Sequence, residues 1–350
     1  MSDQSPRSGR ADAETLAPPR KSLQTAQVWM RRALASLLIV SGLAMFSYAG
    51  VSYYIATKLA YAAPQPLAGN PGEYGLEYAG VSFPAREDGV LIKGWVIPGV
   101  LPDGRYTDDR IIIVVHGTQQ NRTDPGVGLL ALSVALTRHG FAVLAFDMRG
   151  TGESQPAALS MGYFEQRDAL GAADFIRAGG WPFPELGRPR VIGGFGVSMG
   201  GATMLFAASR EPAIRAVVSD CAYADVLPIL EREIPKRGGV PPLFTPGALL
   251  AAHALYGSDY YAVRPVDVIA RIAPRPVFLI HGADDTFVPP SNMIQLYARR
   301  HQLATRTSRH GLCLGPIMPN PFIRRALNTS SESSRSTPPR LGLTRAKRAD

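Results

Sequence analysis

The chain has 350 residues, 46% of them hydrophobic, which is enough for one large α/β domain with additional segments. Its net charge of +9 comes from its ends, because residues 1–32 carry +3, residues 303–350 carry +7 and residues 33–302 carry −1. The neutral central part, without a nucleic-acid-binding motif, excludes a nucleic-acid partner, and two cysteines without a C-x-x-C or H-E-x-x-H motif argue against a disulfide framework or a zinc site.

A basic leader, residues 1–32, precedes an apolar segment, residues 33–56, which holds 24 residues without a charge. As a helix this segment is about 36 Å long, and the hydrocarbon core of a bilayer is about 30 Å thick. Arg31 and Arg32 lie directly before it, whereas only Lys58 follows closely. The positive-inside bias therefore predicts a single-pass membrane anchor, with a cytoplasmic N-terminus and an extracytoplasmic main domain. Tyrosines near its far end are typical of an interfacial belt: Tyr48, Tyr53, Tyr54 and Tyr61.

The alternative for this segment is a cleaved signal peptide, with Ala60-Tyr61-Ala62 as the cleavage site and a secreted product. The long leader and the long apolar core both favour the retained anchor. Residues 57–73 are rich in proline and glycine at their end and predict a linker. The main domain is then expected over residues 74–302.

Short β-rich runs alternate with helical segments from residue 74 onward, which predicts an α/β fold with a mostly parallel sheet and helices on both faces. Strands are predicted over 78–83, 90–97, 111–115, 141–146, 191–195, 214–219 and 276–280, and helices over 127–138, 164–178 and 200–210. The first two strands flank Glu87-Asp88-Gly89 and form a hairpin at the sheet edge. Residues 222–272 interrupt the alternation and predict a lid over the site.

The segment Gly196-Val197-Ser198-Met199-Gly200-Gly201 lies between a predicted strand and an Ala-rich helix. Strand, G-x-S-x-G and helix in this order are the context of a nucleophile elbow. The turn is so tight that the flanking positions must lack side chains, and it lifts the hydroxyl of Ser198 clear of the backbone. The helix that follows offers free N–H groups to a developing oxyanion. The pattern therefore predicts acyl-transfer hydrolysis.

Four motifs follow one another along the chain: His116-Gly117; Asp147-x-Arg149-Gly150-x-Gly152-x-Ser154; Gly196-x-Ser198-x-Gly200-Gly201; and His281-Gly282-x-x-Asp285-x-x-Val288-Pro289. With them, residues 75–300 resemble the α/β-hydrolases of the serine-esterase and aminopeptidase-like superfamily, especially its membrane-anchored bacterial members. The resemblance implies the α/β-hydrolase fold, a small-molecule acyl substrate and chemistry that needs no cofactor or metal. Esterase, peptidase and acyltransferase activities all stay open, as does the oligomeric state.

Ser198 is the expected nucleophile, and it needs a histidine to accept its proton and an acid to orient that histidine. In this fold the oxyanion hole uses the N–H that follows the nucleophile, here Met199, and one N–H from the loop after the third strand. Similarity of the H-G pair assigns the second N–H to Thr118, with Gln119 as the alternative. We expect His116 itself to pack and to hydrogen-bond its loop, because the hole uses backbone groups.

Spacing within the last motif, by similarity to the family, selects Asp285 as the catalytic acid. Asp284 is then expected to be a solvated neighbour, and Asp220, at the end of the preceding strand, is the alternative acid.

Three further charged residues of these motifs and the helix after them are expected to be structural. Asp147 and Arg149 are predicted to form a loop-ordering pair, and Asp168 to be a hydrogen-bonding residue of the helix 164–178.

The histidine of the triad must follow Asp285 in this fold, and two candidates qualify. His301 continues a predicted helix, which leaves His310, 25 residues after the acid, as the expected base. A buried strand should lead into that histidine. Residues 303–309 contain two arginines and three hydroxyl side chains and do not have the pattern of one.

Residues 303–350 have the composition of a disordered, basic tail, rich in serine, proline and arginine. The abrupt change near Arg300 is typical of a shifted reading frame or a substituted C-terminus. Two functions follow from the sequence. The first is a membrane-anchored serine hydrolase that cleaves ester, thioester or amide bonds through an acyl-enzyme. The second is a catalytically silent protein of the same fold that serves as a membrane-bound binding or scaffold module.

Overall fold

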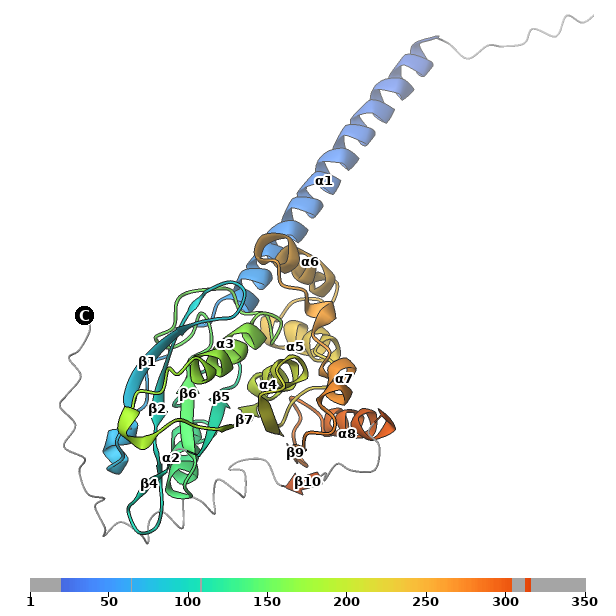
Figure 1. The fold of residues 1–350 in the computed structure, drawn as a ribbon. Coiled ribbons are helices and arrows are strands. Elements are labelled where there is room, and N and C mark those ends of the chain that lie inside the picture. The colour runs from blue at the N-terminus through green and yellow to red at the C-terminus, as the bar shows by residue number, and fades with distance from the viewer. Residues whose placement is uncertain (1–19, 64, 108, 304–311, 316–350) are drawn as a thin grey trace, which may run out of the picture. The chain divides into compact units, whose positions relative to one another are not determined.

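The computed structural model describes residues 20–63, 65–107, 109–303 and 312–315 of the chain (Figure 1). The chain divides into two compact units, residues 1–50 and residues 51–350. The described part of the first unit is helical throughout and belongs to α1, Arg20–Ala60. One stretch of this helix, Thr25–Ala60, is long and apolar enough to cross a membrane. It extends beyond the predicted span 33–56 at both ends, and the residues up to Ala60 are helical where a linker was predicted.

The second unit is built on an eight-stranded sheet of order β1-β2-β6-β5-β7-β8-β9-β10. Its strands are β1 Ala79–Pro84, β2 Leu91–Ile97, β5 Arg110–Val115, β6 Ala142–Phe146, β7 Val191–Val197, β8 Ile214–Asp220, β9 Val277–Gly282 and β10 Leu312–Gly315. All neighbours from β6 to β10 are parallel, whereas β1 pairs antiparallel with β2 and β2 with β6. The predicted mostly parallel sheet with an edge hairpin is confirmed.

The central strands are apolar on both sides because each face of the sheet has its own core. Along β5, Ile111, Ile113 and Val115 belong to one core and Val114 to the other, since alternate residues of a strand point to opposite faces. The second core is completed by α2, Leu129–Arg138, through Leu129 and other residues. The first contains the apolar residues of α3, Glu165–Arg177, and α4, Met199–Arg210. Helices thus cover both faces, as predicted.

The segment between β8 and β9, for which a lid was predicted, is mostly helical. It holds α5 Leu227–Gly238, α6 Phe244–Tyr256, α7 Pro265–Val268 and two 3₁₀ turns, Tyr260–Ala262 and Ile269–Ile272. Ile229, Leu249 and Ile269 are buried in the first core, so much of this segment is part of the domain's packing. The last helix among the described residues, α8 Ser291–Leu303, follows β9 and carries His301, as expected.

Two strand pairings were not predicted. The first is a small two-stranded sheet of β3, Gly99–Val100, and β4, Tyr106–Thr107. The second is β10, which lies within the segment 303–350 for which disorder was predicted and pairs in parallel with β9. Its sequence, Leu-Cys-Leu-Gly, is apolar, and pairing satisfies backbone groups that would otherwise stay unpaired at the edge of β9.

Candidate active site

The carboxyl ends of β7, β8 and β9 lie side by side. Val197 is the register partner of Asp220, which in turn pairs with Ile280. Each strand pair is extended by one further backbone hydrogen bond. After β7, the N–H of Ser198 donates to the carbonyl of Asp220 at 2.7 Å, and after β8, the N–H of Cys221 donates to the carbonyl of Ile280 at 2.8 Å. Residues that follow these strands therefore share one edge of the sheet. This is the edge at which parallel α/β sheets bind their ligands.

Ser198 is the single residue between the end of β7 and the start of α4. Its backbone has φ 55° and ψ −119°, a conformation that costs a residue with a side chain of order 1–3 kcal/mol. Val197 and Met199 on either side are buried, whereas Ser198 is half-buried. No residue in the described part of the chain hydrogen-bonds its hydroxyl. The turn thus presents a free hydroxyl at the edge of the sheet, as a nucleophile elbow requires.

Glycines make this turn possible because neighbouring backbone fills the space that side chains would need. A Cβ on Gly196 would lie 2.2 Å from the carbonyl oxygen of Gly200. A Cβ on Gly200 would lie 2.4 Å from the carbonyl oxygens of both Val115 and His116. The second clash shows that α4 starts in direct contact with the end of β5.

The loop after β5 passes beside the serine. A Cβ on Gly117 would lie 3.7 Å from the Cβ of Ser198, so the backbone leading to Thr118 borders the hydroxyl. Met199 is the first residue of α4, and N–H groups of a first helical turn have no acceptor within their helix. The structure thus brings the Met199 end of α4 and the loop of Thr118 to the same place. The alternative donor, Gln119, is exposed and has φ 57°.

His116 holds this loop through hydrogen bonds of its imidazole, and its side chain is fully buried. Its Nδ1 lies 2.8 Å from the carbonyl oxygen of Gly117, and its Nε2 accepts the N–H of Met148 at 2.9 Å. Since a carbonyl can only accept, Nδ1 carries the hydrogen and the imidazole is neutral. Burial lowers the pKa of His116 to about 4, which keeps it neutral. The expected packing and hydrogen-bonding role matches this geometry.

The prediction that Asp147 and Arg149 pair with each other is wrong, because each has a different partner. Asp147 accepts from Nη1 of Arg122 at 2.7 Å and from the Arg122 N–H at 2.8 Å, and both side chains are buried. Arg149 instead donates to Asp168, from Nη2 at 2.7 Å and from Nε at 2.9 Å, and to Asp88. Two residues of one loop, only two positions apart, thus bind different partners. Both pairs still order the loops, and Asp168 is the hydrogen-bonding residue that was expected.

Asp285 lies in the loop after β9 and is half-buried. Its Oδ1 accepts the N–H groups of Phe287 and Val288, each at 2.9 Å, which holds the carboxylate in place. Asp284 is exposed, as expected of a solvated neighbour. The alternative acid, Asp220, is buried at the end of β8, directly beside the strand that leads to Ser198. Both carboxylates therefore lie at the same edge of the sheet as Ser198.

The expected base, His310, lies outside the described residues. His301 is on α8, where its ring contacts Tyr297 with a centroid distance of 4.1 Å. In the sequence no histidine follows β10, whose carboxyl end is Gly315. Of the three expected triad residues, the structure brings Ser198 and Asp285 to one edge of the sheet.

One group of side chains, which includes Asp285, has the residue types that can hold a metal ion. Potential ligand atoms of Cys221, His281 and Asp285 lie within 4.8 Å of one another in the described part of the chain. His281 is buried; its Nε2 lies 2.7 Å from the carbonyl oxygen of Val288, and its Nδ1 has no hydrogen-bond partner there. The fit is incomplete, because burial, with the nearby charge of Asp220, raises the pKa of the Cys221 thiol and disfavours the thiolate that binds metals.

Sequence reasoning missed three residues that shape the site. Arg122 stacks on the ring of Trp95 at 4.1 Å while it pairs with Asp147. Glu165 is fully buried and accepts from Ser160 and from the N–H of Gly162, and so holds a loop whose Met161 contacts Thr118. The Tyr223 hydroxyl donates to the Met161 carbonyl. No sequence motif indicates these contacts. Those of Arg122 and Tyr223 join segments far apart in the chain, whereas Glu165 bonds residues three and five positions before it.

Comparisons with known proteins agree with this fold. A family model described as the alpha/beta hydrolase fold matches residues 111–252. The uncharacterized protein YfhR of Escherichia coli K12 is 29% identical over 222 residues, which cover 62% of this chain and 66% of that protein. YfhR of Salmonella typhi is 28% identical over 232 residues, 63% of this chain and 69% of that protein. The chain thus spans about two thirds of the length of these relatives.

Solved structures share the fold. The esterase Pf2001 of Pyrococcus furiosus aligns with a TM-score of 0.59 and 20% identity over 78% of this chain and 96% of its own. The acylaminoacyl peptidase of Pyrococcus horikoshii aligns with a TM-score of 0.50 and 16% identity over 77% of this chain and 43% of its own. At these identities the likeness concerns the fold.

Proposed function

We propose, from the premise that the chain belongs to the α/β-hydrolase superfamily, that it is a membrane-anchored serine hydrolase that cleaves acyl esters, thioesters or amides. The observation that carries the proposal is the strained, half-exposed Ser198 between a buried strand end and a helix N-terminus. A serine in a disfavoured backbone conformation persists only where the surrounding structure imposes it. Esterase and peptidase activities among proteins of the same fold are consistent with such a site.

In the proposed reaction, the Ser198 hydroxyl attacks the substrate carbonyl and His310 accepts its proton. The resulting oxyanion accepts hydrogen bonds from the N–H groups of Met199 and Thr118, and Asp285 stabilises the imidazolium. His310 then protonates the leaving group, which departs and leaves an acyl-enzyme. Water hydrolyses that ester by the same steps, releases the acid and restores the serine. Each oxyanion-hole N–H contributes on the order of 10²–10³ in kcat.

The proposed location rests on α1. Its apolar stretch is long enough to span a bilayer, and a signal sequence can have the same length and apolar composition. The basic leader favours a cytoplasmic N-terminus, with the hydrolase unit on the other side of the membrane.

The test is hydrolysis of p-nitrophenyl butyrate by the full-length chain in detergent. We expect Ser198→Ala to lower kcat by at least about 10⁴-fold. His310→Ala should cause a loss of similar order, while the matched variant His301→Ala, on α8, should retain the wild-type rate. Activity that survives in Ser198→Ala would overturn the serine mechanism, and activity that survives in His310→Ala alone would remove that histidine from the triad.

A second candidate function is a catalytically silent binding or scaffold protein of the same fold. It is favoured by the position of β10, because a strand was expected to lead into His310, whereas β10 begins two residues after that histidine. A folded wild-type chain that hydrolyses no acyl ester or amide would support it.

A further inference from the structure

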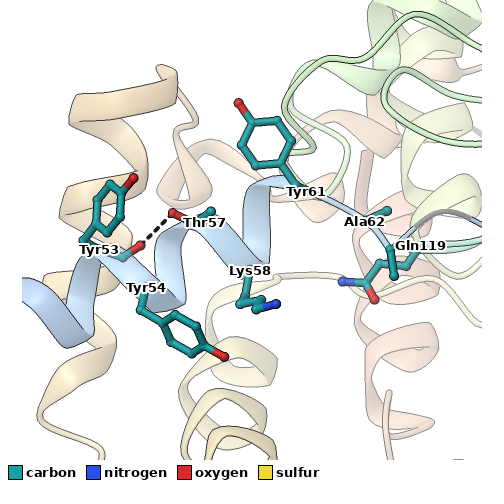
Figure 2. A pocket seen from close by; sticks show the side chains of 8 residues that line it. Tyr53, Tyr54, Thr57, Lys58, Tyr61, Ala62 and Gln119 are labelled. Atoms are coloured by element: carbon teal, nitrogen blue, oxygen red, sulfur yellow. Dashed lines mark hydrogen bonds between the residues drawn. The ribbon is translucent and has the colours of Figure 1, made fainter.

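A pocket of about 530 Å³ lies between the end of α1 and the loop after β5. Its lining comes from two segments: Tyr53, Tyr54, Thr57, Lys58, Tyr61, Ala62 and Ala63 near the end of α1, and Gln119 from the loop (Figure 2). All eight belong to the second unit of the chain. The pocket is thus bounded by the last residues of the proposed membrane anchor, by the residues that follow it and by the loop of the proposed oxyanion hole.

The end of α1 is fixed to the α/β domain, which makes this wall part of the domain. Ile55, Ala56 and Ala60 are buried, and the carbonyl of Ala60 accepts the N–H of Leu159 at 2.8 Å. The hydroxyl of Thr57 lies 3.1 Å from that of Tyr256 on α6. The pocket therefore has a wall held by both backbone and side-chain bonds.

The lining combines one cation with aromatic surface. Lys58 is exposed, and its ammonium lies 5.6 Å from the ring centroid of Tyr54. In the described part of the chain the ammonium forms no ion pair, and no carboxylate lines the pocket. Figure 2 shows Lys58 and Tyr54 on the same side of the helix, with the amide of Gln119 beyond Lys58. An unpaired cation beside tyrosines and an amide suits a ligand with an anionic, hydrogen-bonding head and an apolar remainder.

The pocket is close to the reaction centre. The backbone of Gly117 borders Ser198, and Gln119 is two residues farther along the loop, at most about 7 Å in extended chain. Lys58 also follows the uncharged segment 33–56 by two residues. If that segment spans the bilayer, Lys58 and the tyrosines lie at the level of the lipid headgroups.

We infer that this pocket binds the phosphate headgroup of an anionic membrane lipid and so presents one of its acyl esters to Ser198. The inference rests on the proposed function and names its substrate class. Lys58 pairs with the phosphate, and the Gln119 amide and tyrosine hydroxyls hydrogen-bond the headgroup. Water cleaves the ester through the acyl-enzyme, giving a fatty acid and a lysophospholipid.

The experiment compares kcat/KM of the full-length chain on three substrates: phosphatidylglycerol in mixed micelles, monomeric dihexanoyl phosphatidylglycerol and p-nitrophenyl butyrate. We expect Lys58→Gln to lower the ratio of phosphatidylglycerol to p-nitrophenyl butyrate activity about fivefold, for the micellar and the monomeric lipid alike. Lys93→Gln, which removes an exposed cation on β2, should leave all three rates unchanged.

The possible outcomes separate the inference from the proposed function. A ratio unchanged in Lys58→Gln would overturn the inference alone. A loss confined to micelles would also overturn it, because Lys58 would then attract the anionic surface without binding one headgroup. An equal loss of this activity ratio in Lys93→Gln would also overturn the inference, because the effect would then not depend on the pocket. No hydrolysis of p-nitrophenyl butyrate by the wild-type chain would overturn the proposed function itself.

Discussion

At the scale of single residues, the backbone around Ser198 depends on glycines, because a side chain at Gly196 or Gly200 would clash with neighbouring backbone. Gly196, Gly200 and Gly117 bring β5, β7 and α4 into contact at the point where the hydroxyl emerges. The sequence predicted this turn, because G-x-S-x-G between a strand and a helix has a direct steric meaning. It did not predict that the imidazole of His116 is held neutral next to this turn, since that state depends on the N–H of Met148 in another loop.

Gly200→Ala should destabilise the protein by about 3 kcal/mol, because the added Cβ would lie 2.4 Å from two carbonyl oxygens. Urea unfolding followed by circular dichroism measures the change. The control is Gly80→Ala on β1, where no atom lies within 4 Å of the added methyl group. Equal stabilities of the two variants would show that the turn relaxes to admit a side chain.

Stability should depend on the protonation of His116. Its pKa is about 4 in the folded chain and about 6.5 when unfolded, so the unfolded chain binds the extra proton between these values. This group's contribution to the free energy of unfolding is therefore complete above pH 6.5 and decreases by about 3 kcal/mol as the pH falls to 4. Urea unfolding at several pH values should show a shallower dependence in His116→Gln. An identical dependence in both proteins would contradict the neutral, buried imidazole.

At the scale of elements, the sequence located strands and helices because apolar, β-branched runs have few alternatives between loops rich in glycine and proline. The predicted strand 111–115 and helix 200–210 differ from β5 and α4 by one residue. Contacts between loops could not be predicted in this way. The mistaken pair Asp147–Arg149 shows the reason: charge and proximity in sequence do not reveal that Arg122 reaches Asp147 from the preceding βα loop. The strand β10 was missed because the tail's composition outweighed four apolar residues.

Asp147→Asn should cost about 3 kcal/mol of stability, because it removes the buried charged partner of Arg122 and leaves this buried guanidinium only the exposed carboxylate of Glu153. It should also loosen the loop after β5, which carries Arg122 and the proposed oxyanion-hole residue Thr118, and so lower kcat on p-nitrophenyl butyrate. Thermal unfolding and steady-state kinetics give the two readouts. Asp103→Asn, which removes the exposed ion pair with Arg105, is the control and should change neither. A loss of stability in both variants alike would contradict the role of burial.

At the scale of the whole molecule, charge and hydropathy divide the chain before any fold is considered. The sequence predicted a basic leader, an apolar segment and a neutral hydrolase unit. In the structure residues 51–60, the end of α1, belong to the second unit, where Ile55 and Ala56 are part of the hydrophobic core.

Alkaline carbonate should leave the full-length chain in the membrane pellet, because Thr25–Ala60 is long and apolar enough to cross a bilayer and is proposed to be retained as an anchor. A variant lacking residues 1–50, which keeps the packed end of α1, should be released. Release of the full-length chain, or a mature N-terminus just after Ala62, would contradict a retained anchor and favour a cleaved signal peptide.

The most direct test of the account is labelling with a fluorophosphonate, which reacts covalently with an activated serine. Intact mass spectrometry of the folded, full-length chain should show one adduct, and peptide mapping should assign it to Ser198. Ser198→Ala should show none. A folded wild-type chain that stays unlabelled, or an adduct on any other residue, would contradict the conclusion that this turn presents a catalytic hydroxyl.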